Sequence, residues 1–507
     1  MLAKTNTLSL FGIEGRTITI ETDISAGLPY FVVIGLGDTA VKEASERVRR
    51  AIINSGFSYP KGRITVNLSP AYIYKKGSHF DLGIAIGILR AEGIITAEQN
   101  GRIFLGELSL DGTVLPVKGV LPMISAVVGS DIKEIILPEA NCAESFLITK
   151  DGGPDLIPVK TLQDVTSHIQ GQKIKPYDKE PLEKKESFYP DFADVKGHWE
   201  AKSAIATAMA GAHSILLLGP PGTGKTMLAR RMPGILPPME GEEMLEASKI
   251  YSAAGLLDEE NPIISNRPFR YLNSRITGTQ LVGGHRSASP GEVSFAHKGI
   301  LFLDEMLEYP RSVLELLRSP MEDKKVRMVR RGIGIEYPAD FILVGAANPC
   351  KCGYLGDANH ICTCSQTEID NYRSRLSGPL ADRIDMCLEI NRINYQSMDE
   401  QTSMTSAEMK EKVFQAREIQ KKRFTGTGIS CNSNMEDCHI KEFCELGNEE
   451  KDFLKLAYNK FGISPRRHNK ILKLSRTIAD MESKENIDAA ALTLAIHYTR
   501  FLTDNEN

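Results

Sequence analysis

The segment that most constrains the fold of this chain is residues 219–226, which read Gly-Pro-Pro-Gly-Thr-Gly-Lys-Thr. Four apolar residues at 215–218 come directly before it, and a helix-compatible segment follows it. A strand, a glycine-rich loop and a helix in this order are typical of a phosphate-binding loop, whose backbone N–H groups point at phosphate oxygens. The segment therefore predicts an α/β domain in which a buried strand delivers the chain to a bound phosphate.

Every residue of this loop is a candidate ligand of ATP. The set is Gly219, Pro220, Pro221, Gly222, Thr223, Gly224, Lys225 and Thr226. The glycines allow a tight backbone path, the Lys225 ammonium can reach the β- and γ-phosphates, and the Thr226 hydroxyl can hold Mg²⁺. The alternative is a glycine-rich turn that happens to precede a lysine, and the flanking strand and helix argue against it.

Two carboxylates follow a second apolar run. Residues 300–303 are of buried-strand type and end at Asp304 and Glu305, where a parallel strand would deliver them beside the phosphate loop. Asp304 suits the Mg²⁺ shell, and Glu305 is the candidate to orient the attacking water. A third run, 341–345, leads to Asn348, which could sense the γ-phosphate through that water, although an isolated Asn here is more often a turn residue.

With these residues in view, the chain resembles the AAA+ ATPases, and among them the magnesium-chelatase-like ComM/YifB family of bacteria. The resemblance covers essentially the whole chain. The segments that carry it are 219–226, 299–305, 348–353, 377–385 and 475–480. The resemblance implies ATP and Mg²⁺ as cofactors and a homo-oligomer, a hexameric ring.

The same resemblance implies two arginines that complete the ATP site. Arg383 corresponds to the arginine finger that is offered to a neighbouring subunit's nucleotide, and Arg466 to the lid arginine that contacts the γ-phosphate in cis. Arg375 is the alternative finger. A guanidinium in place during phosphoryl transfer contributes a factor of about 10³ or more in rate. For either arginine taken alone, a surface salt bridge is the competing interpretation.

The predicted fold class is α/β, with an N-terminal α+β domain, a P-loop core and a C-terminal helical lid. Residues 16–22 alternate like a half-buried strand, 38–54 have helical spacing, and the chain after about residue 406 has helical periodicity. The predicted boundaries are an N-terminal domain at 1–170, a charged linker at 171–190, an AAA+ core at 191–395 with an insertion at 349–365, and the lid with the C-terminal domain at 396–507.

The N-terminal domain resembles the Lon-type protease domain of this family, but its catalytic pair is missing. Asp81 stands where an active domain has its nucleophilic serine, and Met123 stands at the lysine position. Ser78 and Lys118 lie nearby in sequence, and we interpret both as mainly structural. A Ser–Lys dyad needs its two groups within hydrogen-bond reach, so we expect this domain to be non-catalytic.

Four of the nine cysteines form a C-x-C-x9-C-x-C pattern: Cys350, Cys352, Cys362 and Cys364. Four thiolates this close in sequence suit a tetrahedral structural Zn²⁺, although the C-x-C spacing is tighter than the usual C-x2-C. The alternative is four reduced thiols. Disulfides are not expected in a cytosolic chain.

A basic hairpin is predicted between the carboxylate motif and the third strand. Cationic and apolar residues alternate from 323 to 331, Gly332 makes the turn, and 333–337 alternate back. The cations are Lys324, Lys325, Arg327, Arg330 and Arg331. By resemblance this hairpin projects into the channel of a ring and holds the phosphates of single-stranded or branched DNA, a contact that Lys and Arg suit. The alternative is a solvated edge hairpin whose charges prevent aggregation.

Composition limits the remaining function classes. The chain has 507 residues and a net charge of −4, which excludes a globally basic nucleic-acid-coating protein. We expect no membrane segment and a cytoplasmic location. Three hypotheses remain. The first is a DNA-translocating motor, for which the family resemblance implies a branch-migration helicase in recombination during natural transformation. The second is a magnesium-chelatase motor subunit that remodels a protein partner, and the third is an ATP-dependent protease, which the missing Ser–Lys pair disfavours.

Overall fold

The computed structural model describes residues 2–97, 101–149, 152–178, 188–284, 289–330, 333–392 and 404–500. The chain divides into two compact units. The first comprises Met1–Lys184, Met244–Ile264 and Met328–Tyr337, and the second comprises Lys185–Glu243, Ser265–Arg327 and Pro338–Asn507. Among the described helices, none has both the length and the apolar character needed to cross a membrane.

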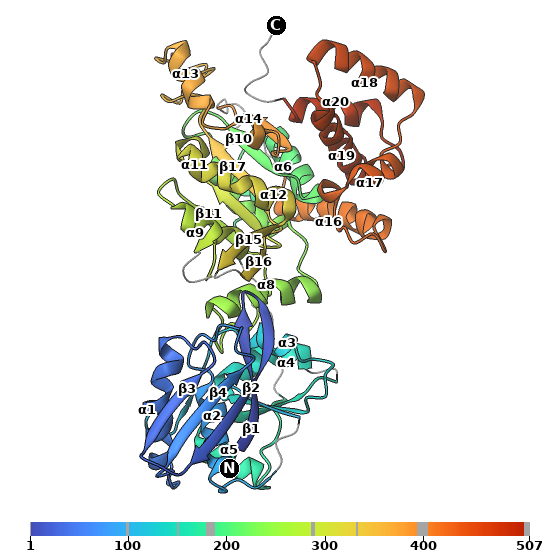
Figure 1. Ribbon diagram of the computed structural model, residues 1–507. Coiled ribbons are helices and arrows are strands. Elements are labelled where there is room, and N and C mark those ends of the chain that lie inside the picture. The colour runs from blue at the N-terminus through green and yellow to red at the C-terminus, as the bar shows by residue number, and fades with distance from the viewer. Residues whose placement is uncertain are drawn as a thin grey trace. The chain divides into compact units, whose positions relative to one another are not determined.

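The first unit is built on a four-stranded sheet in the order β1-β2-β4-β3 (Figure 1). The strands are β1 (Leu2–Phe11), β2 (Glu14–Ser25), β3 (Tyr30–Ile34) and β4 (Arg63–Ser69). β2 pairs antiparallel with β1 and β4, whereas β3 runs parallel to β4. Helix α2 (Asp81–Ala91) packs on β1 and β2 and is buried along almost its whole length.

Helix α1 (Thr39–Asn54) follows the sequence prediction closely. Asp38 caps it by accepting a hydrogen bond from the Val41 N–H at 3.0 Å, and the predicted apolar stripe is the buried face. Gly56 follows the helix with φ +84°, a left-handed conformation that favours glycine at a helix end. Local pattern was therefore sufficient for this element.

A second, parallel sheet completes the unit in the order β5-β8-β9. Its strands are β5 (Arg102–Phe104), β8 (Glu134–Pro138) and β9 (Asp155–Val159), with the short pair β6 (Glu107–Leu108) and β7 (Val114–Leu115). The helices are α3 (Val120–Ser125), α4 (Glu139–Thr149) and α5 (Leu162–Ile169). The unit is thus of mixed α and β composition, and its likeness to a Lon-type domain stays a prediction.

Two segments from later in the chain belong to this unit. Helix α8 (Gly241–Ala254) contributes Ser252, whose hydroxyl donates to Glu144 Oε2 at 2.6 Å and accepts from the Leu121 N–H at 3.3 Å. Ile335 lies against Gly12, where an added methyl group would come within 2.6 Å of Ile335 Cγ2. Long-range packing of this kind leaves no local signal in the sequence.

The second unit contains a five-stranded parallel sheet in the order β11-β14-β17-β10-β18. Its strands are β10 (Ile215–Leu218), β11 (Phe269–Leu272), β14 (Ile300–Leu303), β17 (Ile342–Ala347) and β18 (Met386–Glu389). β10, β14 and β17 are buried throughout, which explains their continuous apolar sequences. Because β10 comes first in the chain but lies between β17 and β18, the strand order reverses there, and ligands bind at the carboxyl ends of strands beside such a reversal.

Helix α6 (Trp199–Gly211) precedes β10, and short helices lie in the connections between the strands. They are α7 (Lys225–Arg231), α9 (Gly278–Val282), α10 (Glu292–Phe295), α11 (Arg311–Leu314), α12 (Arg318–Asp323), α13 (Gln366–Arg373) and α14 (Gly378–Ala381). Single 3₁₀ turns are η1 (Phe192–Asp194), η2 (Met232–Ile235), η3 (Met306–Glu308) and η4 (Glu315–Leu317). A two-residue pairing joins β12 (Gly283–Gly284) to β13 (Ser289–Pro290).

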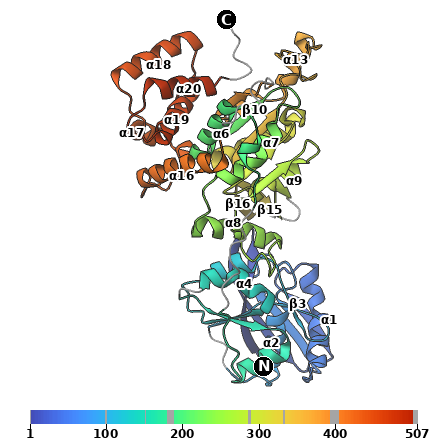
Figure 2. The ribbon, with the colours of Figure 1, turned by 180° about the vertical axis from the view of Figure 1, so that it is seen from behind.

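The last described part of the chain, 404–500, is helical. It contains α16 (Ser406–Arg423), η5 (Asn432–Asn434), α17 (Asp437–Phe443), α18 (Asn448–Phe461), α19 (Pro465–Met481) and α20 (Ala489–Tyr498). α16 and α19 pack against α6, as both views show (Figures 1 and 2).

Motif 475–480 lies in α19 and has a structural role. Asp480 is fully buried and binds the guanidinium groups of Arg423 at 2.7 Å and Arg476 at 3.1 Å. Thr477 shares a hydrogen bond of 2.8 Å with His213, which directly precedes the segment that enters β10. Through the hydrogen bond between Thr477 and His213, the motif connects the helical region to the start of β10 in the parallel sheet.

Candidate nucleotide-binding site

The phosphate loop joins β10 to α7 by a path that only glycine follows without strain. Gly222 and Gly224 have φ values of +80° and +84°, in the left-handed region. Gly219 lies directly against the carbonyl oxygen of Ile390, so a side chain there would collide with backbone. The glycines therefore give the loop the tight backbone path that the sequence pattern predicts.

Lys225 lies over this loop. Its Nζ donates to the carbonyl oxygens of Gly219 at 2.6 Å and Pro220 at 2.8 Å, and to Asn348 Oδ1 at 3.3 Å. Burial lowers the pKa of Lys225 to about 8, and the more distant Asp304 charge only partly opposes that shift. A phosphate oxygen would supply the missing negative charge.

Asp304 is held by three donors at the end of β14. The Thr226 hydroxyl donates to Oδ2 at 3.0 Å, the Tyr271 hydroxyl donates to the same oxygen at 3.1 Å, and the Glu305 N–H donates to Oδ1 at 3.0 Å. A hydroxyl and a carboxylate are hard oxygen ligands of the kind that Mg²⁺ prefers. The donor set at Thr226 and Asp304 therefore fits the ion that the sequence predicts.

Tyr271 was missed by the sequence reasoning. It lies in β11, which borders β14, and the Arg230 guanidinium stands 5.4 Å from the centre of its ring. Burial, together with the neighbouring Asp304, raises the pKa of its phenol. In the sequence, Tyr271 is marked only by its position near the end of a short strand. The contact with Asp304 depends on β11 pairing with β14, and a sequence does not show which strands pair.

Glu305 has an unusual backbone. Its φ is +50°, a left-handed conformation in a residue other than glycine, and it lies directly before η3. Such conformations cost of order 1–3 kcal/mol and are concentrated at functional sites, where the surrounding structure holds them.

Segment 194–198 reaches the phosphate loop through His198. The imidazole hydrogen-bonds with the backbone of Thr223, and burial lowers its pKa, which keeps the ring neutral near pH 7. Together with Asn348, which follows β17, this histidine brings two separate segments to the loop. The predicted ATP-site residues form two hydrogen-bonded pairs, Lys225 with Asn348 and Thr226 with Asp304.

The three predicted arginines have partners outside the phosphate loop. Arg383 forms an ion pair with Glu322, and Arg466 Nη2 lies 3.7 Å from Glu322 Oε1. Arg375 donates to the carbonyl of Leu307 at 2.8 Å and to Glu308 at 3.0 Å, in the turn that follows Glu305. The predicted finger and the predicted lid arginine therefore share one carboxylate, a pairing that the sequence did not predict.

The four predicted cysteines come together. The Sγ of Cys350 lies 3.4 Å from that of Cys352 and 3.7 Å from that of Cys362, and the latter two lie 3.5 Å apart. The Cys352 N–H donates to the Cys364 Sγ at 3.3 Å. All four sulfur atoms lie within 4.8 Å of one another, and none is in a disulfide.

The basic hairpin consists of β15 (Lys325–Arg330) and β16 (Ile333–Pro338), as the sequence predicts. One face is apolar and buried and contains Val326, Met328, Ile335 and Tyr337. Arg327 lies on the exposed face. Lys324 at the base forms an ion pair of 3.4 Å with Asp340. Arg331 and the side chain of Arg330 lie outside the described residues.

The structure does not bring Ser78 and Lys118 together. Ser78 hydrogen-bonds with Glu107, whereas the aliphatic part of Lys118 packs on Gly255. Asp81, at the expected nucleophile position, is buried and binds Arg47 through two hydrogen bonds of 2.7 and 3.1 Å. Burial raises the pKa of Asp81 to about 6 despite this guanidinium. Met123 is also fully buried.

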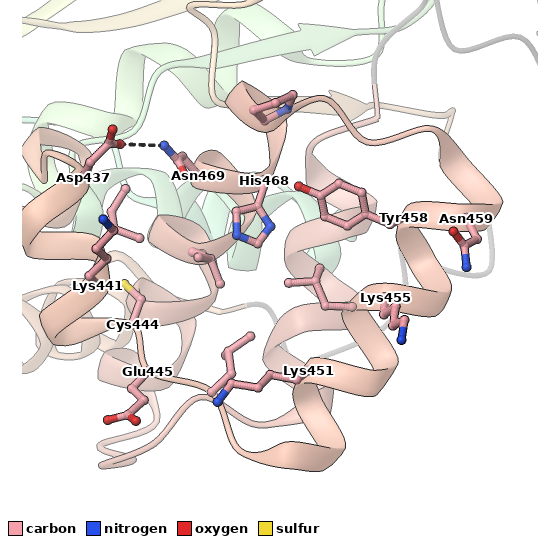
Figure 3. A pocket seen from close by; sticks show the side chains of 15 residues that line it. Asp437, Lys441, Cys444, Glu445, Lys451, Lys455, Tyr458, Asn459, His468 and Asn469 are labelled. Carbon is pink, nitrogen blue, oxygen red and sulfur yellow. Dashed lines mark hydrogen bonds between the residues drawn. The ribbon is translucent and has the colours of Figure 1, made fainter.

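A pocket of about 870 Å³ lies between α17, α18 and α19 (Figure 3). Leu454 and Leu472 contribute apolar lining, and Lys441, Lys451 and Lys455 contribute cationic groups. Asp437 accepts a hydrogen bond of 2.9 Å from Asn469 across one side. None of the predicted site residues is among those that line this pocket, so it is separate from the candidate nucleotide site.

Three family models match successive parts of the chain. They describe the magnesium chelatase subunit ChlI at residues 191–398, subunit ChlI of Mg-chelatase at 20–141, and the C-terminal part of magnesium chelatase subunit ChlI at 403–499. The match at 191–398 contains the phosphate loop, both carboxylates, the cysteine cluster and the hairpin.

Individual proteins are also similar to the chain, two of them over nearly its whole length. Competence protein ComM of Haemophilus influenzae is 39% identical over 96% of this chain and 95% of its own length. The uncharacterized protein YifB of Escherichia coli is 37% identical over 98% of this chain and 97% of its own length. The magnesium-chelatase 67 kDa subunit of Heliobacterium mobile is 28% identical over 32% of this chain and 29% of its own length.

Proposed function

Because this chain belongs to the magnesium-chelatase-like ComM/YifB family of AAA+ ATPases, we propose that it is a ring-forming ATPase motor that acts on DNA, specifically a branch-migration helicase. The single observation that best supports an ATP-driven motor is the pair of hydrogen bonds that join Lys225 to Asn348 and Thr226 to Asp304 at the carboxyl ends of adjacent strands. The competence role in the name of one full-length relative supports recombination during natural transformation as the process.

These four residues and Glu305 have distinct tasks in hydrolysis. Lys225 exchanges its loop carbonyls for phosphate oxygens, and Asn348, which accepts a hydrogen bond from that ammonium, senses the γ-phosphate through the attacking water. Glu305 orients the attacking water and accepts its proton. Thr226 and Asp304 would hold Mg²⁺, which neutralises charge on the phosphates. Because the donors are held before ATP binds, little reorganisation is needed in the transition state.

Two substitutions separate binding from chemistry at this site. Lys225→Ala should abolish nucleotide-dependent activity, whereas Glu305→Gln should retain ATP binding and stop hydrolysis, because it alters only the group that orients the water. Binding of a fluorescent ATP analogue and phosphate release measure the two steps. Turnover at the wild-type rate by Glu305→Gln would remove that residue from the mechanism.

We propose that Arg383 acts on the nucleotide of a neighbouring subunit in a hexameric ring and that Arg466 acts in cis. Glu322 then holds both guanidinium groups until nucleotide and neighbour are present. Mixing Arg383→Ala protein with Lys225→Ala protein should restore part of the activity, because shared interfaces pair an intact finger with an intact phosphate loop. No recovery at any ratio, with subunit exchange demonstrated, would argue against a finger in trans.

DNA contact is assigned to the basic hairpin. The exposed position of Arg327 and the buried apolar face behind it support a hairpin that presents charge to a ligand rather than a fully solvated edge. Replacing Lys325, Arg327, Arg330 and Arg331 by Gln should leave basal ATPase activity largely intact, since none belongs to the nucleotide site. DNA stimulation and fork unwinding should collapse.

Lys324→Gln is measured as a separate variant, because Lys324 belongs to the predicted DNA-binding set but is also paired with Asp340, so its loss acts on hairpin stability as well as on DNA. The salt dependence of DNA affinity is the decisive measurement. Every DNA phosphate that the variant no longer binds should flatten the log–log slope by about one unit. An unchanged slope and unchanged unwinding in the Gln variant would leave the hairpin as a charged edge and overturn the DNA assignment.

The family matches also favour a second candidate, a chelatase-type motor that remodels a protein partner. Such a motor should hydrolyse ATP faster in the presence of its protein partner and show no response to single-stranded or forked DNA. Protease activity is a weaker alternative. ATP-dependent cleavage of an unfolded protein that Ser78→Ala abolishes would support it, against the separation of Ser78 from Lys118 described above.

We also propose zinc as the ion of the cysteine cluster. Zinc–thiolate bonds of about 2.3 Å in a tetrahedron place the sulfur atoms about 3.8 Å apart. The observed separations of 3.4 to 3.7 Å match this spacing within a few tenths of an ångström. Elemental analysis should find about one zinc ion per chain in protein purified without added metal, and Cys362→Ser should abolish it.

A further inference from the structure

The cysteine cluster lies directly beside the phosphate loop. Cys350 follows Asn348 by two residues, and Asn348 accepts a hydrogen bond from Lys225. Gly353 lies against Pro221 of the phosphate loop, where an added methyl group would come within 2.9 Å of Pro221 Cδ. The same methyl group would also lie 3.8 Å from Asn348 Cγ. The loop that carries the cysteines thus touches two parts of the ATP site.

The backbone around the first two cysteines forms a tight turn. The Gly353 N–H donates to the Cys350 carbonyl at 3.0 Å, which closes the turn around Cys352. Gly353 has φ +87°, so this turn requires glycine at that position. The turn therefore joins the backbone of Cys350 and Cys352 directly to the glycine that lies against the phosphate loop.

We infer that the metal-loaded cysteine loop braces the phosphate loop, so that binding of zinc at the cysteines sets the affinity of the ATP site for nucleotide. The inference rests on the proposed zinc site and on nucleotide binding, and it is independent of DNA as the substrate. The cysteines bind the ion as thiolates, so each thiol that is protonated beforehand releases its proton to solvent when the ion binds.

The physical reason is the charge and spacing of the sulfur atoms, all four within 4.8 Å of one another and three of them 3.4 to 3.7 Å apart. Without an ion, thiolates at such distances repel one another, and neutral thiols make only weak hydrogen bonds. Neither state holds the loop as a tetrahedral ion does. Release of the loop removes Gly353 from Pro221 and loosens the segment that carries Asn348, so the donors aimed at phosphate are no longer pre-positioned.

The first test uses the wild-type, full-length protein. Zinc is removed with a thiol-competing chelator, the chelator is exchanged away, and affinity for a fluorescent ADP analogue is measured at constant Mg²⁺. We expect affinity to fall about tenfold, the size of one misplaced hydrogen bond to a charged group. Added Zn²⁺ should restore the affinity, and additional Mg²⁺ should not. Tetrahedral Co²⁺ spectra report whether all four sulfur atoms bind the metal.

The second test separates the brace from the metal. Gly353→Ala places a methyl group against Pro221, whereas Gly356→Ala in the same loop, with φ +77°, meets no atom within 4 Å. Both variants place alanine at a left-handed φ and carry the same type of backbone strain, so they differ mainly in the contact with Pro221. Gly353→Ala should retain zinc and lose affinity about tenfold, by the same hydrogen-bond reasoning, and Gly356→Ala should bind nucleotide like the wild-type protein.

The outcomes are distinguishable. Failure to bind Zn²⁺ or Co²⁺ would overturn both the zinc site and the brace. Bound zinc whose removal leaves nucleotide affinity unchanged, or an affinity loss that zinc does not reverse, would overturn the brace alone. Equal behaviour of the two glycine variants would overturn the route through Pro221. Should Gly353→Ala fail to fold, the wild-type metal cycle decides the question, and DNA-stimulated turnover independently tests the motor.

Discussion

Nucleotide affinity should depend on pH through Lys225. Its ammonium is partly buried against neutral acceptors, which lowers its pKa to about 8. A bound phosphate favours the charged form and raises the pKa, so binding takes up a proton at alkaline pH. Affinity should therefore be highest below pH 8 and should decrease as the pH rises through the pKa of the free protein.

The size of this effect follows from the two pKa values. An ammonium with a free pKa of about 8 is about three-quarters charged at pH 7.5 and about one-tenth charged at pH 9. If bound phosphate returns the pKa to about 10.4, affinity falls about eightfold over that interval. Solvent reaches part of the side chain and screens the interaction, so eightfold is an upper figure.

Isothermal titration calorimetry with a non-hydrolysable ATP analogue measures both quantities. Titrations at several pH values give the affinity, and buffers of different ionisation enthalpy give the proton uptake. Lys225→Arg is the matched control, because a guanidinium stays charged throughout. His198 does not interfere, since burial lowers its pKa. Nucleotide affinity that depends on pH equally in Lys225→Arg, or that does not depend on pH in the wild-type protein, would refute the reasoning.

Two further predictions concern residues that the structure singles out. Tyr271→Phe removes one donor from Asp304 and should raise the Mg²⁺ concentration for half-maximal ATPase activity about tenfold. Nucleotide affinity in the absence of Mg²⁺ should not change. An unchanged Mg²⁺ requirement would remove Tyr271 from the site. Arg47→Met leaves Asp81 buried and unpaired and should destabilise the protein by about 3–5 kcal/mol at pH 8. Because the folded-state pKa of Asp81 is raised, that loss should shrink toward pH 5 as the carboxyl becomes protonated. Urea denaturation at both pH values measures it, and exposed Arg50→Met should cost less than about 1 kcal/mol.

Much of the fold was predictable because its signals are local. The apolar runs of β10, β14 and β17, the glycines of the phosphate loop, and the capping Asp38 of α1 each depend on residues within a few positions of one another. The alternation of the basic hairpin and the paired cysteines are local patterns of the same kind. Backbone sterics and the periods of helix and strand connect such patterns to structure without any knowledge of the fold.

Contacts between distant segments were decided only by tertiary structure. The hydrogen bond from Tyr271 to Asp304 depends on β11 lying beside β14, and the position of Gly353 depends on β17 lying beside β10. Glu322 is the shared partner of two arginines that stand far from it in sequence. Strand order and the packing of side chains set these pairs. Because many orders satisfy the same local patterns, the sequence alone determined the chemistry of the site but not which neighbours hold it.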